Sequence, residues 1–559
     1  MSRRRALSLA ALILVIYLVV QLAGLRSMGL TDDDDFYVPA GISYAEWLGR
    51  ALRFEARAWT REGIDAAFQL NREHPPFAKY VFGICHFVFR GVLGPTDAAR
   101  VGTVLFSTLA AAMLLAMAIS HLGRRRGLEV GGLAVLMLLT LPRFFFHSHA
   151  ATLDVPVSAM YLAAGALALR SERSTRAAWW VGPVFGLAAA TKLNAPFLLL
   201  AYLPFVFLVR WRRGGAAPDG SDPTNPAAAG LRLPSLPLSL FSMAILGVGT
   251  FFLSWPWIWT EVPKRVSEYV SFHLHHYGIY FLYFGQIYSK DPFAPWHSPF
   301  VMAATTIPLA TSVLAIAGLI FAIPRIILRL RFRDGPDDDR RMEGDLLIFV
   351  VLNVVTTIGV VAFAGTPIYG GEKLFMPFFP FWCLLAGYGA ERARARIGFE
   401  LGPSVGPRGR WIVAGALGLA AASGLALQLR FGAYALSEYN GLAGGLRGAT
   451  ATGFERQYYD VAHRDLVAWL SREGPPNLKV HFLPNNWEYV RTYRWYKQAG
   501  ELRPDITVVD GEQQADWVVI THERRFARYG EDLERYRTRP VLQERLLDGT
   551  PIWSVVKAR

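Results

Sequence analysis

The chain has 559 residues, of which 53% are hydrophobic and 18% are charged. This composition excludes an ordinary soluble domain, because apolar runs of about 17–25 residues recur along the chain and each is long enough to span a bilayer. A net charge of +14 would suggest nucleic-acid binding in a soluble protein. Here, however, the arginines gather between the apolar runs, which is the positive-inside pattern of a multi-pass membrane protein. We therefore expect no nucleic-acid partner.

The N-terminal segment predicts the orientation of the chain. Three arginines at positions 3–5 precede the apolar run 6–25. This run is long and no small-residue cleavage site follows it, so we interpret it as an uncleaved first span rather than a signal peptide. The arginines place the N-terminus in the cytoplasm. The span then delivers four consecutive aspartates, at 32–35, to the outer face, where we expect like charges to stand in water.

Residues 26–98 form the first predicted outer loop, with helices that lie on the membrane surface. The stretch 77–93 is apolar and resembles a span, but it carries Lys79, His86 and Arg90. If it crossed the bilayer, the arginines at 124–126 and most later clusters would fall outside, against the positive-inside rule. We therefore interpret 77–93 as an interfacial or re-entrant segment.

The remaining apolar runs complete a count of about eleven spans, with the N-terminus inside and the C-terminus outside. A second outer loop, 256–298, is rich in tryptophan, tyrosine and histidine. The predicted spans are 6–25, 99–121, 128–146, 155–169, 178–191, 195–209, 237–255, 299–323, 345–364, 374–389 and 411–429.

After the last span the pattern changes. Charge density rises and long apolar runs stop, while short apolar stretches at 478–483, 506–509 and 517–520 predict buried strands and 461–470 predicts a helix. The fold class is thus a polytopic α-helical membrane protein. Residues 1–431 form its predicted transmembrane domain, and 432–559 form a small extracytoplasmic α/β domain.

Two acidic sites are expected on the outer face. One is the aspartate run, and the other is Asp154 at the mouth of the span 155–169. A carboxylate at the membrane surface can deprotonate an acceptor hydroxyl that comes within hydrogen-bond reach. The alternative is structural, because Asp also suits the first turn of a helix. Together the two sites could hold an acceptor, a divalent metal ion or an acid–base pair.

Cationic residues sit at the outer ends of apolar segments and would form a positive rim. Any single lysine there could simply extend to the interface, but a cation at membrane depth is by default a functional hypothesis. An anionic lipid head group such as a phosphate is the matching ligand. The residues of this rim are Lys79, Lys192 and Lys373, with His74 beside them.

Aromatic and polar residues of the outer loops are the candidates for binding the substrate. Most of the aromatic residues in 256–298 would serve as an interfacial belt, but aromatic faces with polar edges also suit a carbohydrate ring. The histidines at 273, 275 and 276 lack the carboxylate or cysteine spacing of a metal site. The predicted substrate-binding residues are His74, Tyr37, His297 and Glu372.

No nucleotide-binding loop of the phosphate-cradling type occurs in the sequence, so a lipid-borne donor fits better than a nucleotide sugar. We expect no resident cofactor, with a divalent metal as the open alternative.

The order of these motifs resembles the C-type glycosyltransferase superfamily, and most closely its dolichyl-phosphate-mannose-protein mannosyltransferase-like branch. That branch is in turn similar to the lipid A aminoarabinose transferases. The motifs that carry the resemblance are Asp33-Asp34-Asp35-Phe36-Tyr37, His74-Pro75-Pro76, Asp154-Val155-Pro156, Ala190-Thr191-Lys192-Leu193-Asn194 and Lys373-Leu374-Phe375-Met376-Pro377.

The resemblance implies inverting transfer of a sugar from a polyprenyl-phosphate carrier on the outer face of the membrane. Asp33 or Asp34 would be the base that activates the acceptor hydroxyl, and Asp154 would assist. Lys373 stands where many relatives have arginine and would bind the carrier phosphate, with Lys79 and Lys192 as further phosphate ligands. Asp34 stands where relatives often have glutamate, so the register of the base is open by one residue.

The expected partners are the lipid-linked donor, a protein, lipid or glycan acceptor, and membrane lipids, and the expected location is the bacterial inner membrane. Two alternatives remain: a flippase or transporter of a lipid-linked sugar, and a structural subunit of the envelope. A transporter would more often show broken helices and charges at the bilayer midplane, whereas these charges gather at one face.

Overall fold

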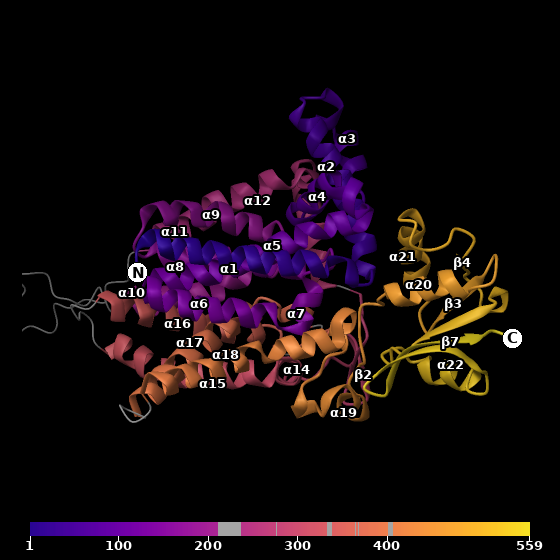
Figure 1. Ribbon diagram of the computed structural model, residues 1–559. Coiled ribbons are helices and arrows are strands. Elements are labelled where there is room, and N and C mark those ends of the chain that lie inside the picture. The colour runs from indigo at the N-terminus through magenta and orange to yellow at the C-terminus, as the bar shows by residue number, and fades with distance from the viewer. Residues whose placement is uncertain (211–235, 276, 332–337, 364, 367, 401–405) are drawn as a thin grey trace, which may run out of the picture.

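A computed structural model describes residues 1–210, 236–275, 277–331, 338–363, 365–366, 368–400 and 406–559. The described chain is predominantly helical. Its long helices lie roughly parallel in a bundle, with the N-terminus at one end and a β-sheet with its own helices beyond the other end (Figure 1).

Five helices in the described residues are long and apolar enough to cross a membrane, which makes this a multi-pass membrane protein. Two further apolar helical stretches, Ala195–Arg210 and Leu238–Ser254, are shorter. The number of eleven spans stays a prediction. The five are Arg3–Ser27, Pro95–Leu122, Leu309–Arg331, Asp338–Gly359 and Ala414–Ser437.

Two predicted spans are interrupted where a proline follows an extended residue. The run 128–146 divides at Leu141, before Pro142, and the run 299–323 divides at Ile307, before Pro308. Proline disfavours the helical conformation of the residue before it and cannot donate to the preceding turn. The helices of the bundle are α1 (Arg3–Gly24), α5 (Pro95–Leu122), α6 (Arg124–Leu139), α7 (Pro142–His147), α8 (Asp154–Ser171), α9 (Thr175–Ala189), α10 (Leu198–Arg210), α11 (Leu238–Ser242), α12 (Val248–Ser254), α14 (Ser298–Thr306), α15 (Leu309–Arg331), α16 (Asp338–Gly359), α17 (Phe378–Glu400) and α18 (Gly406–Phe431).

The region predicted as the first outer loop is mostly helical and projects beyond the side of the bundle (Figure 1). It contains α2 (Asp32–Leu52), α3 (Arg61–Phe68) and α4 (Phe77–Leu93), and α4 has the bounds predicted for the interfacial segment. α2 begins at the aspartate run because Thr31 and Asp34 form a capping box and because carboxylates in a first turn oppose the helix dipole.

Glycines allow α2 and α4 to approach closely. A Cβ on Gly83 would lie 1.9 Å from the carbonyl oxygen of Gly41, well inside any allowed contact. The region predicted as the second outer loop contains α13 (Val262–Leu274) and a hairpin of β1 (Phe281–Tyr283) and β2 (Gln286–Tyr288).

The C-terminal region forms a five-stranded mixed sheet in the order β4-β3-β5-β7-β6. The three predicted strands are confirmed as β3 (Lys479–Leu483), β4 (Thr507–Val508) and β5 (Trp517–Thr521), which pair in parallel. The sequence did not predict β6 (Val541–Leu547) and β7 (Thr550–Lys557), which extend the sheet in antiparallel fashion. The helices of this region are α19 (Gly445–Ala451), α20 (Arg464–Glu473), α21 (Trp487–Gln498) and α22 (Tyr529–Arg535).

The sheet region contacts the start of α2. Arg491 of α21 pairs with Asp35 at 2.5 Å, and Arg464 of α20 pairs with Asp97 of α5 at 2.6 Å. Leu30 and Ala462 form an isolated antiparallel bridge. These contacts bring the segment 454–463, which leads into α20, against the aspartate run.

Candidate functional site

Asp33 and Asp34 are buried in the protein, so the expectation that the aspartate run stands in water is wrong for these two, while Asp32 and Asp35 are half-buried. Asp33 is 7% exposed and Asp34 is 1% exposed. The four side chains leave the first turn of α2 in different directions, as helical geometry requires of consecutive residues, and each meets a different partner. Asp32 accepts the backbone N–H of Asp33, and Asp35 accepts from Arg491 and Trp495.

Asp34 is held in a buried ion pair. Arg100 donates from Nε to Asp34 Oδ1 at 2.9 Å and from Nη2 to Oδ2 at 2.6 Å. The backbone N–H groups of Ala151 and Thr31 and the Thr31 hydroxyl also donate to this carboxylate. Burial raises the pKa of Asp34, but Arg100 and these hydrogen bonds outweigh it, and the net pKa is lowered. Five donors use its acceptor positions, and they tie α2 to α5 and to the loop before α8.

Asp33 has fewer donors among the described residues. Lys373 Nζ donates to Asp33 Oδ2 at 2.9 Å, and the hydroxyl of Tyr459 donates to the same oxygen at 2.8 Å. The ammonium also lies 4.3 Å from the centre of the Tyr459 ring. Because a carboxylate offers about four lone-pair positions, Asp33 keeps acceptor capacity that Asp34 has used.

Asp154 joins the same group from the first residue of α8. Lys192 Nζ donates to Asp154 Oδ1 at 2.5 Å, and Tyr459 Oη lies 3.2 Å from Asp154 Oδ2. Burial raises the pKa of Asp154, but Lys192 and Lys373 more than offset burial, so the net pKa is lowered and the carboxylate is ionised. The structure thus brings Asp33, Asp154, Lys192 and Lys373 together, across 340 residues of sequence between the first and the last.

The charges in this cluster keep Lys373 protonated. Burial lowers its pKa, yet Asp33 and Asp154 raise it more strongly, and the net pKa lies above the ordinary lysine value. In a site that combines carboxylates with lysine side chains, a carboxylate can take a proton from a hydroxyl while an ammonium group neutralises a departing phosphate.

Glu372 is fully buried and forms an ion pair with Arg143, whose Nη1 donates to Glu372 Oε2 at 2.9 Å. The hydroxyl of Tyr458 donates to Glu372 Oε1 at 2.7 Å, and His147 Nε2 lies 2.9 Å from that hydroxyl. Arg143 also donates to the backbone carbonyl of Glu438. This network holds the loop before Lys373 in place. Glu372 therefore affects the cluster only indirectly, through the residues that it positions.

The side chain of Lys79 points toward residues 71–74, in the loop that precedes its own helix. Its ammonium donates to the carbonyl of Asn71 at 2.7 Å, to the Asn71 side-chain oxygen at 2.9 Å and to the carbonyl of His74 at 2.7 Å. These three contacts use the three donors of an ammonium. Lys79 therefore holds residues 71–74 in place and does not join Lys192 and Lys373.

Of the remaining predicted residues, Tyr37 and His74 lie together, with ring centroids 6.0 Å apart. Burial raises the pKa of Tyr37 well above its usual value, and the charges of Asp33 and Asp154 raise it further. His297 instead shares a 2.7 Å hydrogen bond with the hydroxyl of Tyr283 in β1.

Sequence reasoning missed Tyr459, Arg100 and Arg143. Arg100 and Arg143 did carry a signal, since a lone arginine beside or inside an apolar run calls for a buried partner. Tyr459 carried none, because its role depends on how the segment 454–463 folds back onto α2.

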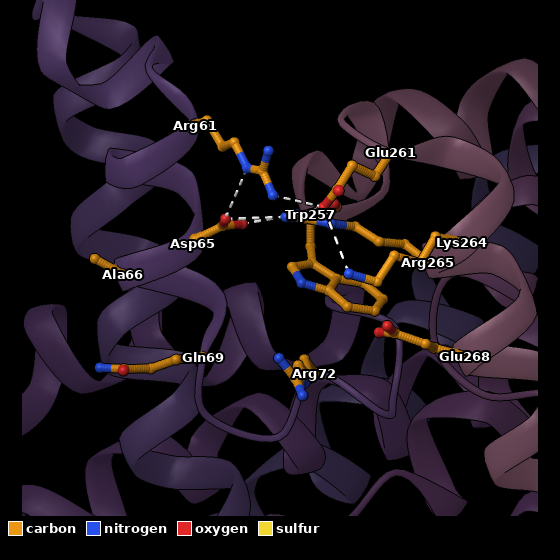
Figure 2. A pocket seen from close by; sticks show the side chains of 10 residues that line it. All are labelled: Arg61, Asp65, Ala66, Gln69, Arg72, Trp257, Glu261, Lys264, Arg265 and Glu268. Atoms are coloured by element: carbon orange, nitrogen blue, oxygen red, sulfur yellow. Dashed lines mark hydrogen bonds and ion pairs between the residues drawn. The ribbon is translucent and has the colours of Figure 1, made fainter.

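A separate pocket of about 450 Å³ opens between α3 and α13 (Figure 2). Its charges largely pair with each other: Arg61 with Glu261 at 2.6 Å, and Arg265 with Asp65 at 2.7 Å. No predicted site residue lines it. Within the described part of the chain, no group of three or more His, Cys, Asp or Glu side chains could hold a metal ion.

Comparison with known proteins gives one family match. Residues 73–216 match the family model of dolichyl-phosphate-mannose-protein mannosyltransferases, which confirms the resemblance found in the motifs over that part of the chain. No curated protein matches the chain significantly.

Similar solved structures include the ArnT protein from Cupriavidus metallidurans in the apo state. It has 16% sequence identity and a TM-score of 0.49, with 99% of this chain and 98% of that chain covered. The same protein bound to undecaprenyl phosphate has 15% sequence identity and a TM-score of 0.48, with 98% of each chain covered. A third structure is the archaeal oligosaccharyltransferase AglB from Archaeoglobus fulgidus, in complex with an inhibitory peptide and a dolichol-phosphate. It has 11% sequence identity and a TM-score of 0.46, with 97% of this chain and 74% of that chain covered.

Proposed function

We propose that this protein transfers a sugar, with inversion, from a polyprenyl-phosphate carrier to an acceptor hydroxyl at the outer face of the membrane. The observation that carries the proposal is the buried cluster of Asp33, Asp154, Lys192 and Lys373, in which two carboxylates face two ammonium groups. The family match over 73–216 includes Asp154 and Lys192 and supports the same chemistry.

Asp33 is the base in this proposal. A base must accept a proton from the acceptor hydroxyl at about 2.6–3.2 Å, and Asp33 has acceptor capacity for this contact. Asp34 is committed to Arg100 and three further groups, so its role is to hold the first turn of α2. In this proposal the base is therefore Asp33 of the two positions that the family resemblance left open.

Lys373 neutralises the carrier phosphate as it leaves, and Lys192 assists from the other side of Asp154. The bond from the anomeric carbon to the phosphate oxygen breaks with its electron pair on that oxygen. The acceptor oxygen bonds to the opposite face of the same carbon, and its proton goes to Asp33. A fixed cation where charge develops stabilises the transition state. Lys79 takes no part, because its three donors hold the loop 71–74.

In this proposal Tyr37 of α2, which the charges of Asp33 and Asp154 reach, contacts the substrate together with His74, whose ring packs against it. His297 belongs to the aromatic outer loop and would meet the substrate at a distance from the reacting atoms. We assign the cluster to the extracytoplasmic side of a bacterial inner membrane, in a bundle of eleven spans (1–431), with the region 432–559 above it. The donor is a lipid-linked sugar and the acceptor a protein, lipid or glycan, and no nucleotide or nucleic acid takes part.

The test is transfer from radiolabelled polyprenyl-phosphate sugars in native membranes, which contain the full-length protein together with its acceptor, with Lys373→Met compared with Lys264→Met. Lys264 is an exposed lysine of α13, distant in sequence from the cluster. We expect the Lys373 variant to lose about 100-fold in rate and the Lys264 variant to match the wild type. If every carrier sugar stays intact with the wild type, or if both variants keep full activity, the proposed function is wrong.

A further inference from the structure

The hydroxyl of Tyr459 occupies the space between the two carboxylates. It donates to Asp33 Oδ2 at 2.8 Å and lies 3.2 Å from Asp154 Oδ2. An acceptor hydroxyl that gives its proton to Asp33 while lying beside Asp154 would need the same position. Tyr459 is buried, so in this structure the chain itself fills the place next to the proposed base.

The hydroxyl does not satisfy both carboxylates. A phenol has a single O–H donor, and burial together with Asp33 and Asp154 raises the pKa of Tyr459 well above its usual value, so this proton stays on the oxygen. Asp33, at the shorter distance, receives it. Asp154 Oδ2 then faces a lone pair of the phenol oxygen, so two carboxylate oxygens share one donor.

The backbone at Tyr459 is strained. Its φ is +85°, and the next residue, Asp460, has a φ of +45°. Bulky residues avoid this region, and such strain persists only where surrounding contacts impose it. Here Arg525 and Asn485 hold the carboxylate of Asp460.

We propose that the gap between Asp33 and Asp154 is the acceptor subsite, that it takes a vicinal diol of a sugar or polyol, and that Tyr459 is its resident occupant until the acceptor displaces it. The inference rests on the proposed function. A vicinal diol carries two O–H donors on adjacent carbons. One hydroxyl meets Asp33 and becomes the nucleophile, while the other meets Asp154, which Lys192 keeps ionised and in place.

The reaction balances with this acceptor. The diol oxygen next to Asp33 forms the new bond to the anomeric carbon, and its proton passes to the Asp33 carboxylate. The carbon–oxygen bond to the carrier phosphate breaks, and the phosphate leaves with the electron pair. The second diol hydroxyl keeps its proton and its hydrogen bond to Asp154.

The experiment uses the purified full-length protein, a radiolabelled polyprenyl-phosphate sugar and two small acceptors, propane-1,2-diol and propan-1-ol. Formation of the water-soluble glycoside gives kcat and KM for each. We expect kcat/KM to be at least about tenfold higher for the diol, because a site built for two hydroxyls leaves one carboxylate unpaired with a single alcohol.

Removing the resident hydroxyl should favour the acceptor. We expect Tyr459→Phe to lower KM for propane-1,2-diol about tenfold, since a hydrogen bond to a charged group is worth about that factor and a larger competent fraction tightens apparent binding. The matched control is Tyr434→Phe. It removes a tyrosine hydroxyl that donates to Asp465 at 2.6 Å, outside the cluster, and it should leave KM unchanged.

Equal kcat/KM for the two alcohols, or donor use without transfer to either, would overturn the diol subsite. A fall in kcat with unchanged KM in Tyr459→Phe would show that Tyr459 positions Asp33 instead of occupying the subsite, and would also overturn the inference. The absence of any donor use by the wild type contradicts the proposed function, and the inference falls with it, so the two failures are distinguishable.

Discussion

At the scale of single residues, the neighbours Asp33 and Asp34 have opposite surroundings. Asp34 meets a buried guanidinium and backbone N–H groups, whereas Asp33 meets a lysine and a tyrosine that lie next to a second carboxylate. The sequence predicted that one of the two would be the base. It could not choose between them, because the choice depends on Arg100 and Tyr459, which lie 66 and 426 residues away.

This difference predicts separate effects on stability. Asp34→Asn takes from the buried Arg100 its close, doubly hydrogen-bonded carboxylate and leaves only Asp97 at 3.6 Å, and breaking such a buried pair costs about 3–5 kcal/mol. Asp33→Asn removes a partner from Lys373, which Asp154 still faces, so the loss should be about 1 kcal/mol. Thermal unfolding in detergent measures both. Equal shifts in the two variants would argue against a purely structural role for Asp34.

At the scale of elements, the position of Asp33 depends on how closely α2 packs against α4. A methyl group on Gly83 would collide with the carbonyl of Gly41. We therefore expect Gly83→Ala to separate the two helices and to lower stability by about 1–3 kcal/mol.

Gly91 is the matched control, because it lies on the same helix and a Cβ there would meet nothing within 4 Å. Gly91→Ala should be neutral or slightly stabilising, since alanine favours a helix over glycine. Both changes can be followed by thermal unfolding together with donor turnover. A Gly83→Ala variant as stable and active as Gly91→Ala would mean that this approach does not position the site.

Element bounds followed from hydropathy where the pattern was uniform, as in α4. Hydropathy did not predict the helix ends at Leu141 and Ile307, because apolar residues continue across each break and only the following proline indicates it. The strand β6 was not predicted because it is a largely exposed edge strand. Gln543, Glu544 and Arg545 interrupt its apolar residues, so it lacks the apolar run that identified β3 and β5.

At the scale of the whole molecule, the site lies where the bundle meets the C-terminal region. The aspartate run comes from the N-terminal part, Lys373 from a late loop, and Tyr459 from the segment after the last predicted span. Hydropathy and arginine clusters predicted the class of fold. The contacts between the three segments could not be predicted, because each pairs residues that no local pattern connects.

The predicted orientation can be tested by labelling. Glu473 of α20 and Arg125 of α6 are both exposed, and the native cysteines, Cys85 and Cys383, are buried. In intact cells, a membrane-impermeant thiol reagent should label Glu473→Cys and leave Arg125→Cys unlabelled until the cells are lysed. Labelling of Arg125→Cys in intact cells would reverse the orientation and move the site to the cytoplasmic face.

The most direct test of the central claim compares Asp33→Asn with Asp32→Asn in the turnover of a radiolabelled polyprenyl-phosphate sugar. Asparagine keeps the size of the side chain and removes its basicity, and loss of a general base typically costs about 10²–10⁴ in rate. We predict a loss of at least about 100-fold for Asp33→Asn in a folded protein, and near wild-type turnover for Asp32→Asn. An Asp33→Asn variant that keeps more than about a third of wild-type turnover would contradict Asp33 as the base.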